Sequence, residues 1–254
     1  MDTDQVGLLK RRALLSAGAG AAQAAVSVEI GDAAPVPQSA VVALAVEAKH
    51  AYDAITKSLR MTSFPNIRIV VTETFDGTEV KISQSYPRLL LILIPPHIIQ
   101  RRIVPLAHEL THVIAGPAAD DILSEGLAVY YHEKFGTDPA FPNFGDPLDH
   151  ALPEALKVRF NTQDVAAAAE AFSHELGATT DKTATLTDWI DDIDNQDARA
   201  LAYIVAGSYV RFLIETMYEG DTRKFLELYR SGDYGSALGV SADETWGLWL
   251  KILP

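Results

Sequence analysis

The sequence predicts an α+β fold, in which a small β-sheet packs on one helix and a mostly helical part follows. Two observations indicate this class. Apolar and β-branched runs bounded by proline and glycine lie in the front of the chain, and apolar residues recur at helical spacing almost everywhere after them. The chain has 254 residues, of which 48% are hydrophobic. This length is sufficient to bury a core without disulfides.

The front of the chain supplies the strands of the predicted sheet. VSVEI is typical of a short strand, and an Ala/Val/Leu-rich segment from Ser39 to about Met61 is typical of a helix that Ser39 can cap. NIRIVVTE and RLLLILI follow as two more strands, with turn residues at Asp76 and Gly77 between them. We expect the last strand to end at the Pro-Pro pair after it.

The rest of the chain reads almost entirely as helix, with breaks at glycine and proline. The proline-rich run 136–153 is expected to be a surface loop or lid. The stretch Arg199–Glu219 carries one apolar helical stripe, and a final helix is expected from about Ala242 to Leu253.

Charge and composition exclude several classes of partner and site. The formal net charge of −13 repels phosphate backbones, so nucleic acid is not an expected partner. The chain has no cysteine, which excludes disulfides, thiolate zinc sites and a cysteine nucleophile. Any metal must therefore use histidine and carboxylate ligands.

The amino terminus has the order of an export signal. LLKRRALLSAGAGAAQAAVS contains paired arginines, a weakly apolar run and a small-residue site at Ala22 and Ala24. It resembles a bacterial twin-arginine signal, and its apolar run is too short to span a membrane. The competing interpretation is a helix at the start of a cytoplasmic protein. We expect export and no stable membrane span, whereas the oligomeric state stays open.

The strongest chemical signal lies in the run LAHELTH. His108 and His112 are four residues apart, so on a helix they share one face and can direct two imidazole nitrogens at one cation. Glu109 is rotated by about 100° from His108, which puts its carboxylate beside that cation and in reach of a bound water. Without a ligand, these polar groups would have to be buried among Leu, Val and Ile, which is costly.

A tetrahedral catalytic zinc site takes three protein ligands, so a third ligand is needed. A histidine six residues after His112 would indicate a metzincin, but that residue is Ala118. The best candidate is Glu125, because Asp120 or Asp121 can cap a second helix that carries Glu125 toward the histidines. Histidine and carboxylate ligands suit Zn²⁺, the expected cofactor.

HELTH followed by SEGLAVYY resembles the gluzincin metallopeptidases, and more specifically the small bacterial peptidase MA-like domains. The resemblance covers most of the chain after about Ser39. It implies a zincin-like fold in which His108, His112 and Glu125 bind zinc. Glu109 would be the general base, taking a proton from the zinc-bound water that attacks a peptide carbonyl.

The chain departs from the gluzincin pattern at two points. Only 12 residues separate His112 from Glu125, fewer than is usual for gluzincins. Val129 stands where thermolysin-like enzymes place an aspartate that steadies a ligand histidine. The resemblance also offers Tyr203, in YIVAGS, as a catalytic donor to the oxyanion. A core tyrosine is the competing interpretation of Tyr203.

The expected function is zinc-dependent hydrolysis of peptide bonds in a peptide or protein substrate. Two alternatives stay open: a non-catalytic zincin-scaffold domain for binding or structure, with metal as a staple, and a metal-dependent hydrolase of a non-peptide amide. The expected organisation is a lead-in with an export signal at 1–38, an α+β zincin part with both motif helices at 39–136, and a loop and helical subdomain of the same catalytic unit at 137–254.

The other histidines and acidic runs are expected to be structural. His132 and His174 each precede a glutamate but lack the second histidine, which favours a solvent-facing helix. His132 also lies two turns after Glu125 on a similar face, so it could support a metal ligand, but a partly buried structural position is the stronger of these two alternatives. His97 and His150 are expected in loops, and DWIDDIDNQD is expected to begin an acidic helix.

Overall fold

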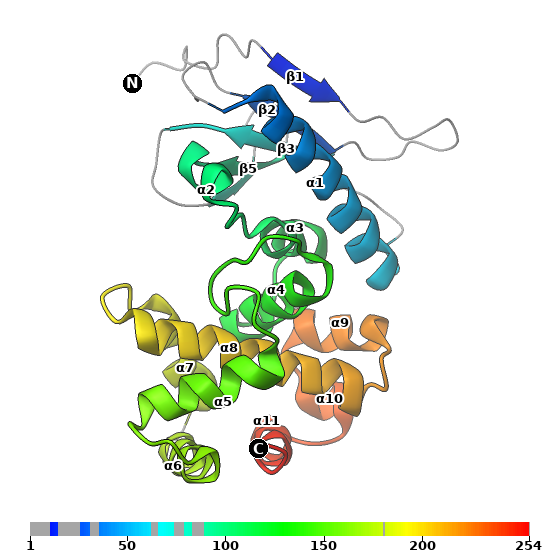
Figure 1. Ribbon diagram of the computed structural model, residues 1–254. Helices are drawn as coiled ribbons and strands as arrows, with labels where there is room; N and C mark the ends of the chain where they lie inside the picture. The colour runs from blue at the N-terminus through cyan, green and yellow to red at the C-terminus, as the bar shows by residue number, and fades with distance from the viewer. Residues whose placement is uncertain are drawn as a thin grey trace, which may run out of the picture. The chain divides into compact units, whose positions relative to one another are not determined.

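The structure is a computed structural model that describes residues 11–14, 26–30, 36–61, 66–73, 79–82, 89–179 and 181–253. The chain divides into two compact units. One comprises residues 1–116 and 135–139, and the other comprises residues 117–134 and 140–254. Both the small sheet and the predominance of helix are present, which confirms the predicted mixture of secondary structure (Figure 1).

The first unit is built on a mixed sheet. Over the described residues the strand order is β1-β2-β3-β5-β4, with a parallel centre and antiparallel edges. Its strands are β1 (Arg11–Leu14), β2 (Val26–Ile30), β3 (Asn66–Val71), β4 (Glu79–Ile82) and β5 (Leu89–Ile94). The sequence predicted β2, β3 and β5 but not β4. Alternate residues of β3 are fully buried, as a strand covered on one face requires.

Helix α1 (Gln38–Ser58) packs against β2 and against α3 (Leu106–Ala115). Its buried face includes Leu44, Ala48 and Ile55, which recur at helical spacing. The predicted Ser39 cap is wrong. Pro37 occupies the N-cap position without a side-chain hydrogen bond, and the helix begins before Ser39.

A short helix, α2 (Pro96–Arg101), follows β5 after Pro95. The sequence predicted the end of the strand at this point but no helix. Proline suits the first position of a helix because the N–H that it lacks would have no partner within the helix. His97 lies in α2, so its predicted position in a loop is wrong.

The second unit is helical throughout its described secondary structure. Its helices are α4 (Asp121–Phe135), α5 (Leu148–Arg159), α6 (Val165–Gly177), α7 (Lys182–Asp191), α8 (Gln196–Phe212), the π-helix η1 (Leu213–Met217), α9 (Thr222–Ser231), α10 (Tyr234–Leu238) and α11 (Ala242–Leu250). Helix α8 contacts α5, α7 and α11 and supplies much of the core.

The apolar stripe predicted for residues 199–219 belongs to this core helix. Within the described residues, the continuous helix Gln196–Met217 is long and apolar enough to cross a membrane by length and composition alone. However, 61% of its most apolar window is buried inside the protein. A mostly buried core helix passes the same test of length and composition.

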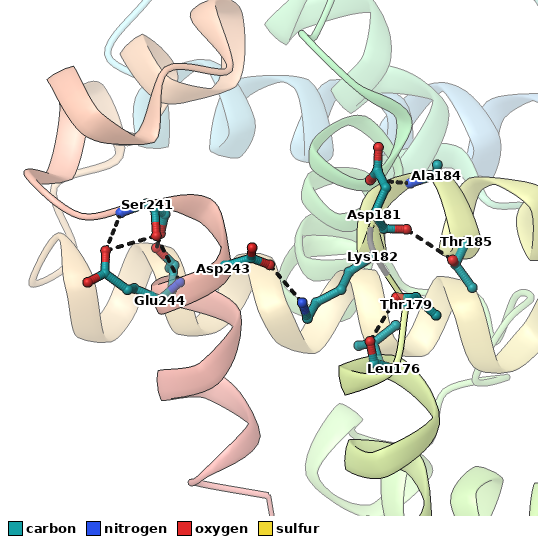
Figure 2. A network of polar contacts seen from close by, with 10 residues as sticks. Leu176, Thr179, Asp181, Lys182, Ala184, Thr185, Ser241, Asp243 and Glu244 are labelled. Carbon is teal, nitrogen blue, oxygen red and sulfur yellow. Dashed lines mark hydrogen bonds and ion pairs between the residues drawn. The ribbon is translucent and has the colours of Figure 1, made fainter.

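Side chains at the helix ends connect distant segments of the second unit (Figure 2). The Asp181 carboxylate caps α7, accepting a hydrogen bond of 3.0 Å from the backbone N–H three residues later. Ser241 and Glu244 form a capping box at the start of α11, where the final helix was predicted. Lys182 and Asp243 form an ion pair of 2.7 Å, which joins the first turns of α7 and α11.

Two expectations for the second unit need correction. The predicted loop 136–153 gives way to α5 at Leu148, so His150 lies in a helix, with its Nδ1 2.7 Å from the Asp146 carboxylate. The run DWIDDIDNQD ends α7 at Asp191 before it reaches Asn195, which caps α8. Only its last two residues begin a helix, with Asp197 in the first turn of α8, so the expected acidic helix start is confirmed in part.

Part of the predicted export signal lies outside the described residues. Arg11 and Arg12 fall in β1, which pairs with β2. The small-residue site at Ala22 and Ala24 is not among the described residues. Export therefore stays a prediction.

Candidate metal centre

Helix α3 carries the two histidines on one face, as their four-residue spacing predicts. The Nε2 atoms of His108 and His112 are 3.1 Å apart, and the rings meet edge to face at an angle of 78°. His108 is buried, with 8% of its surface exposed, and His112 is half-buried. The two ring nitrogens therefore meet in a partly desolvated environment.

Local sequence determines where α3 begins and ends. Pro105 is its N-cap, and the Pro105 carbonyl accepts a hydrogen bond from the Glu109 N–H. Gly116 ends the helix at a φ of 76°, a conformation that favours glycine, and its N–H bonds to the His112 carbonyl. Both histidines consequently lie in one uninterrupted helix.

Glu125 lies in the second turn of α4 and is half-buried. The helix starts at Asp121, and the Asp120 carboxylate accepts a hydrogen bond of 2.8 Å from the Leu123 N–H. Asp120 is therefore the cap, one of the two residues predicted for this role. Burial raises the pKa of Asp120, and its hydrogen bond from Leu123 acts in the opposite direction.

The residue after Glu125 fixes how α4 packs on α8. A Cβ at Gly126 would lie 2.4 Å from the Ala206 carbonyl oxygen, and a Cβ at Gly207 would lie 2.5 Å from Val129. Helices α4 and α8 thus each have a glycine at the point of close contact with the other helix. Val129 is buried in this contact, at the position where the gluzincin resemblance leads one to expect an aspartate. The small residues in SEGLA and VAGS were the only sequence signal of this packing.

The candidate ligand atoms of His108, His112 and Glu125 all lie within 4.8 Å of one another. Two imidazole nitrogens and a carboxylate oxygen are a donor set that Zn²⁺ accepts. In a tetrahedral zinc site, two nitrogen ligands are separated by about 3.3 Å, close to the 3.1 Å between the histidine nitrogens. The three residues therefore fit a zinc ion in type and in the spacing of the histidines.

Glu109 is half-buried on α3, directly after His108. It is the group that the sequence predicted beside the metal rather than on it. Consecutive residues of a helix are rotated by about 100° about its axis, so Glu109 does not share the helix face of His108 and His112, and its role stays a prediction.

Tyr203 lies on α8 with 9% of its surface exposed. Its ring meets that of Phe141 edge to face at 5.2 Å, and the guanidinium of Arg199 lies 5.7 Å from the centre of each ring. These contacts are those of a packed core tyrosine. Its predicted catalytic role stays a prediction.

His132 and His174 differ in burial. His132 is buried, with 7% of its surface exposed, so the solvent-facing interpretation is wrong and the structural interpretation agrees with its position. His174 is exposed on α6, as predicted.

No protein-family model and no curated protein sequence matches the chain. Among solved structures, the chain is similar to a mutant of an M1 zinc metallopeptidase from Deinococcus radiodurans, with a TM-score of 0.48 and 14% sequence identity. The match covers 96% of this chain and 52% of that one. The chain thus spans about half the length of that protein.

Proposed function

We propose that the protein is a zinc-dependent metallopeptidase of the gluzincin type. The observation that supports this most strongly is the pair of ring nitrogens of His108 and His112, 3.1 Å apart on α3, with the Glu125 carboxylate in the same group of candidate ligands. Three ligands leave one position of a tetrahedral site for water, which is the arrangement of catalytic zinc.

His108, His112 and Glu125 hold the metal in this proposal. When bound, Zn²⁺ supplies a Lewis acid that lowers the pKa of water and polarises a carbonyl group. The burial of His108 lowers the local dielectric, which strengthens the interaction of these ligands with a cation.

Glu109 is the general base. It follows His108 on α3, and in this proposal its carboxylate would accept a proton from the attacking water. The same carboxylate then passes the proton to the leaving amine. The Tyr203 hydroxyl is proposed as the donor that stabilises the oxyanion.

A direct hydrogen bond between the histidines is the competing explanation of their separation. A neutral imidazole can donate from one ring nitrogen to the other ring, and 3.1 Å permits this. In that case the pair would be a structural contact with no affinity for metal. Metal analysis separates the two explanations.

The test uses the purified full chain, its zinc content by mass spectrometry and its cleavage of a quenched fluorescent peptide library. We expect stoichiometric zinc in the native protein and its loss in His112→Ala. Glu109→Gln should retain zinc and lose roughly 10²- to 10⁴-fold in cleavage rate. Glu175→Gln is the matched control, because this glutamate also follows a histidine but lies outside the metal group. The control should keep both zinc and activity.

Each other result contradicts a specific part of the proposal. Undiminished cleavage by Glu109→Gln would show that Glu109 is not the general base. Zinc that is bound without cleavage of any peptide or amide would identify a structural metal, and cleavage confined to non-peptide amides would identify a different hydrolase. A native chain with no zinc affinity would leave the histidine hydrogen bond as the explanation.

A further inference from the structure

The second unit holds a pocket that shares no residue with the candidate metal ligands. It has a volume of about 380 Å³ and is lined by side chains of α5, α8, η1 and α11 and by the two residues Ile252 and Leu253. This volume lies at the lower end of the range for small-molecule sites. The apolar part of its lining includes Leu152, Phe212 and Trp249.

The charges that line the pocket favour a cation. Asp149 and Glu215 contribute two carboxylates, and Arg211 contributes one guanidinium. The guanidinium is already paired, with Asp149 through Nη2 and with the Glu133 carboxylate through Nη1 at 3.5 Å. Lys134 adds a second positive charge, because its ammonium donates to the Tyr130 hydroxyl that bonds to Glu215. The three carboxylates still outnumber the two cationic groups, so an added cation meets net negative charge.

Glu215 is held at the pocket by the π-helix and by a tyrosine. It lies in η1, and π-helical segments occur frequently at functional sites. The Tyr130 hydroxyl donates a hydrogen bond of 2.9 Å to Glu215 Oε1. Burial, together with this carboxylate, raises the pKa of Tyr130, so the hydroxyl stays protonated and continues to donate.

We propose that this pocket binds a small organic cation: a primary ammonium or guanidinium group on an apolar body. The cationic group hydrogen-bonds to the carboxylates of Asp149 and Glu215, and the apolar body packs against Phe212 and Trp249. A free amine and a lysine or arginine side chain of a polypeptide share this chemistry. The proposal is independent of the peptidase function.

Binding can be measured on the full chain by amide NMR with three isosteric probes: phenethylamine, phenethyl alcohol and hydrocinnamate. We expect phenethylamine to shift the signals of η1 and of the first turns of α5, and to bind at least about tenfold more tightly than the neutral or anionic probe. Equal binding of the alcohol, or tighter binding of hydrocinnamate, would overturn the proposal.

Two variants test the assigned residues. Glu215→Gln and Asp149→Asn should each raise the Kd for phenethylamine by about tenfold, because each removes a charge-assisted hydrogen bond. Glu170→Gln, an exposed residue of α6 that does not line the pocket, should leave the Kd unchanged. Unfolding curves identify any variant that is not folded. An unchanged Kd in both folded pocket variants would overturn the assignment.

A second series of probes distinguishes the sources of the cation. An acetylated lysine or arginine dipeptide amide that binds more tightly than phenethylamine would indicate a polypeptide side chain. The reverse order would indicate a free amine. Either order supports the pocket as a cation site, and the absence of binding by both kinds of probe would refute it.

Discussion

Gly126 on α4 lies so close to Ala206 on α8 that a Cβ at Gly126 would stand 2.4 Å from the Ala206 carbonyl oxygen. The obstructing atom belongs to the backbone, so it cannot rotate away. Because Glu125 is the preceding residue, the contact also determines where the backbone of this candidate ligand lies in the second unit. Gly126 therefore has a role in helix packing, and it directly follows the proposed metal ligand Glu125.

Replacing this glycine should destabilise the protein. We expect Gly126→Ala to lower the free energy of unfolding by about 2 kcal/mol, since the two helices must separate to admit the methyl group. Gly247→Ala in α11 is the matched control, because a Cβ there has no atom within 4 Å. Alanine at 247 should raise stability by about 0.5–1 kcal/mol through its helix propensity. Urea denaturation of both variants measures the difference, and equal effects would contradict the packing argument.

The features of the candidate site that depend on residues close together in the chain could be predicted from the sequence. His108 and His112 are related by one helical turn, and Gly116 and Asp120 mark helix ends through contacts within four residues. Such features depend on neighbours in the chain, so the sequence contains them. The shared face of the two histidines and the cap of α4 were predicted in this way.

The features that the sequence did not predict depend on contacts between distant segments. The pocket brings Asp149, Arg211 and Trp249 together from three helices, and no local pattern relates them. The helices α2 and α5 were missed for a different reason. Proline was read as a break, although Pro96 begins α2 and Pro153 lies inside α5.

Zinc should stabilise the fold if the three ligands act together. A ligand that binds only the folded state adds about 2.7 kcal/mol to the free energy of unfolding at a hundredfold excess over its Kd. We therefore expect the Tm of chelator-treated protein to rise on addition of zinc, and Glu125→Gln to lose most of that rise. His174→Ala is the control, because this exposed histidine lies outside the metal group. A full zinc response in Glu125→Gln would exclude Glu125 as a ligand.

The cap of α4 should give a pH-dependent contribution to stability. Burial raises the pKa of Asp120 above its ordinary value of 3.8, so the folded state binds its proton more tightly than the unfolded state does. For such a group the stabilising contribution is present below that ordinary value and is lost as the pH rises through the folded pKa. Asparagine caps helices as well as aspartate does and carries no charge.

We therefore expect the stability of Asp120→Asn relative to the native protein to increase as the pH is raised from about 4 toward neutrality. Asp120→Ala removes the hydrogen bond from Leu123 and should be about 1 kcal/mol less stable than the asparagine variant at each pH. Denaturant titrations across this pH range measure both differences. A difference between the asparagine variant and the native protein that does not change with pH would contradict the assignment of the shift to Asp120.

Replacing Tyr203 distinguishes a catalytic role of its hydroxyl from a packing role of its ring. Tyr203→Phe keeps the ring that meets Phe141 and removes only the hydroxyl. If the hydroxyl stabilises the oxyanion, kcat should fall by about 10²-fold while zinc content and KM change little. Tyr234→Phe is the control, because the Tyr234 hydroxyl accepts a buried hydrogen bond from Tyr209 in the same unit. It should cost about 1 kcal/mol of stability and leave kcat unchanged. An unaltered kcat in Tyr203→Phe would assign Tyr203 to packing alone.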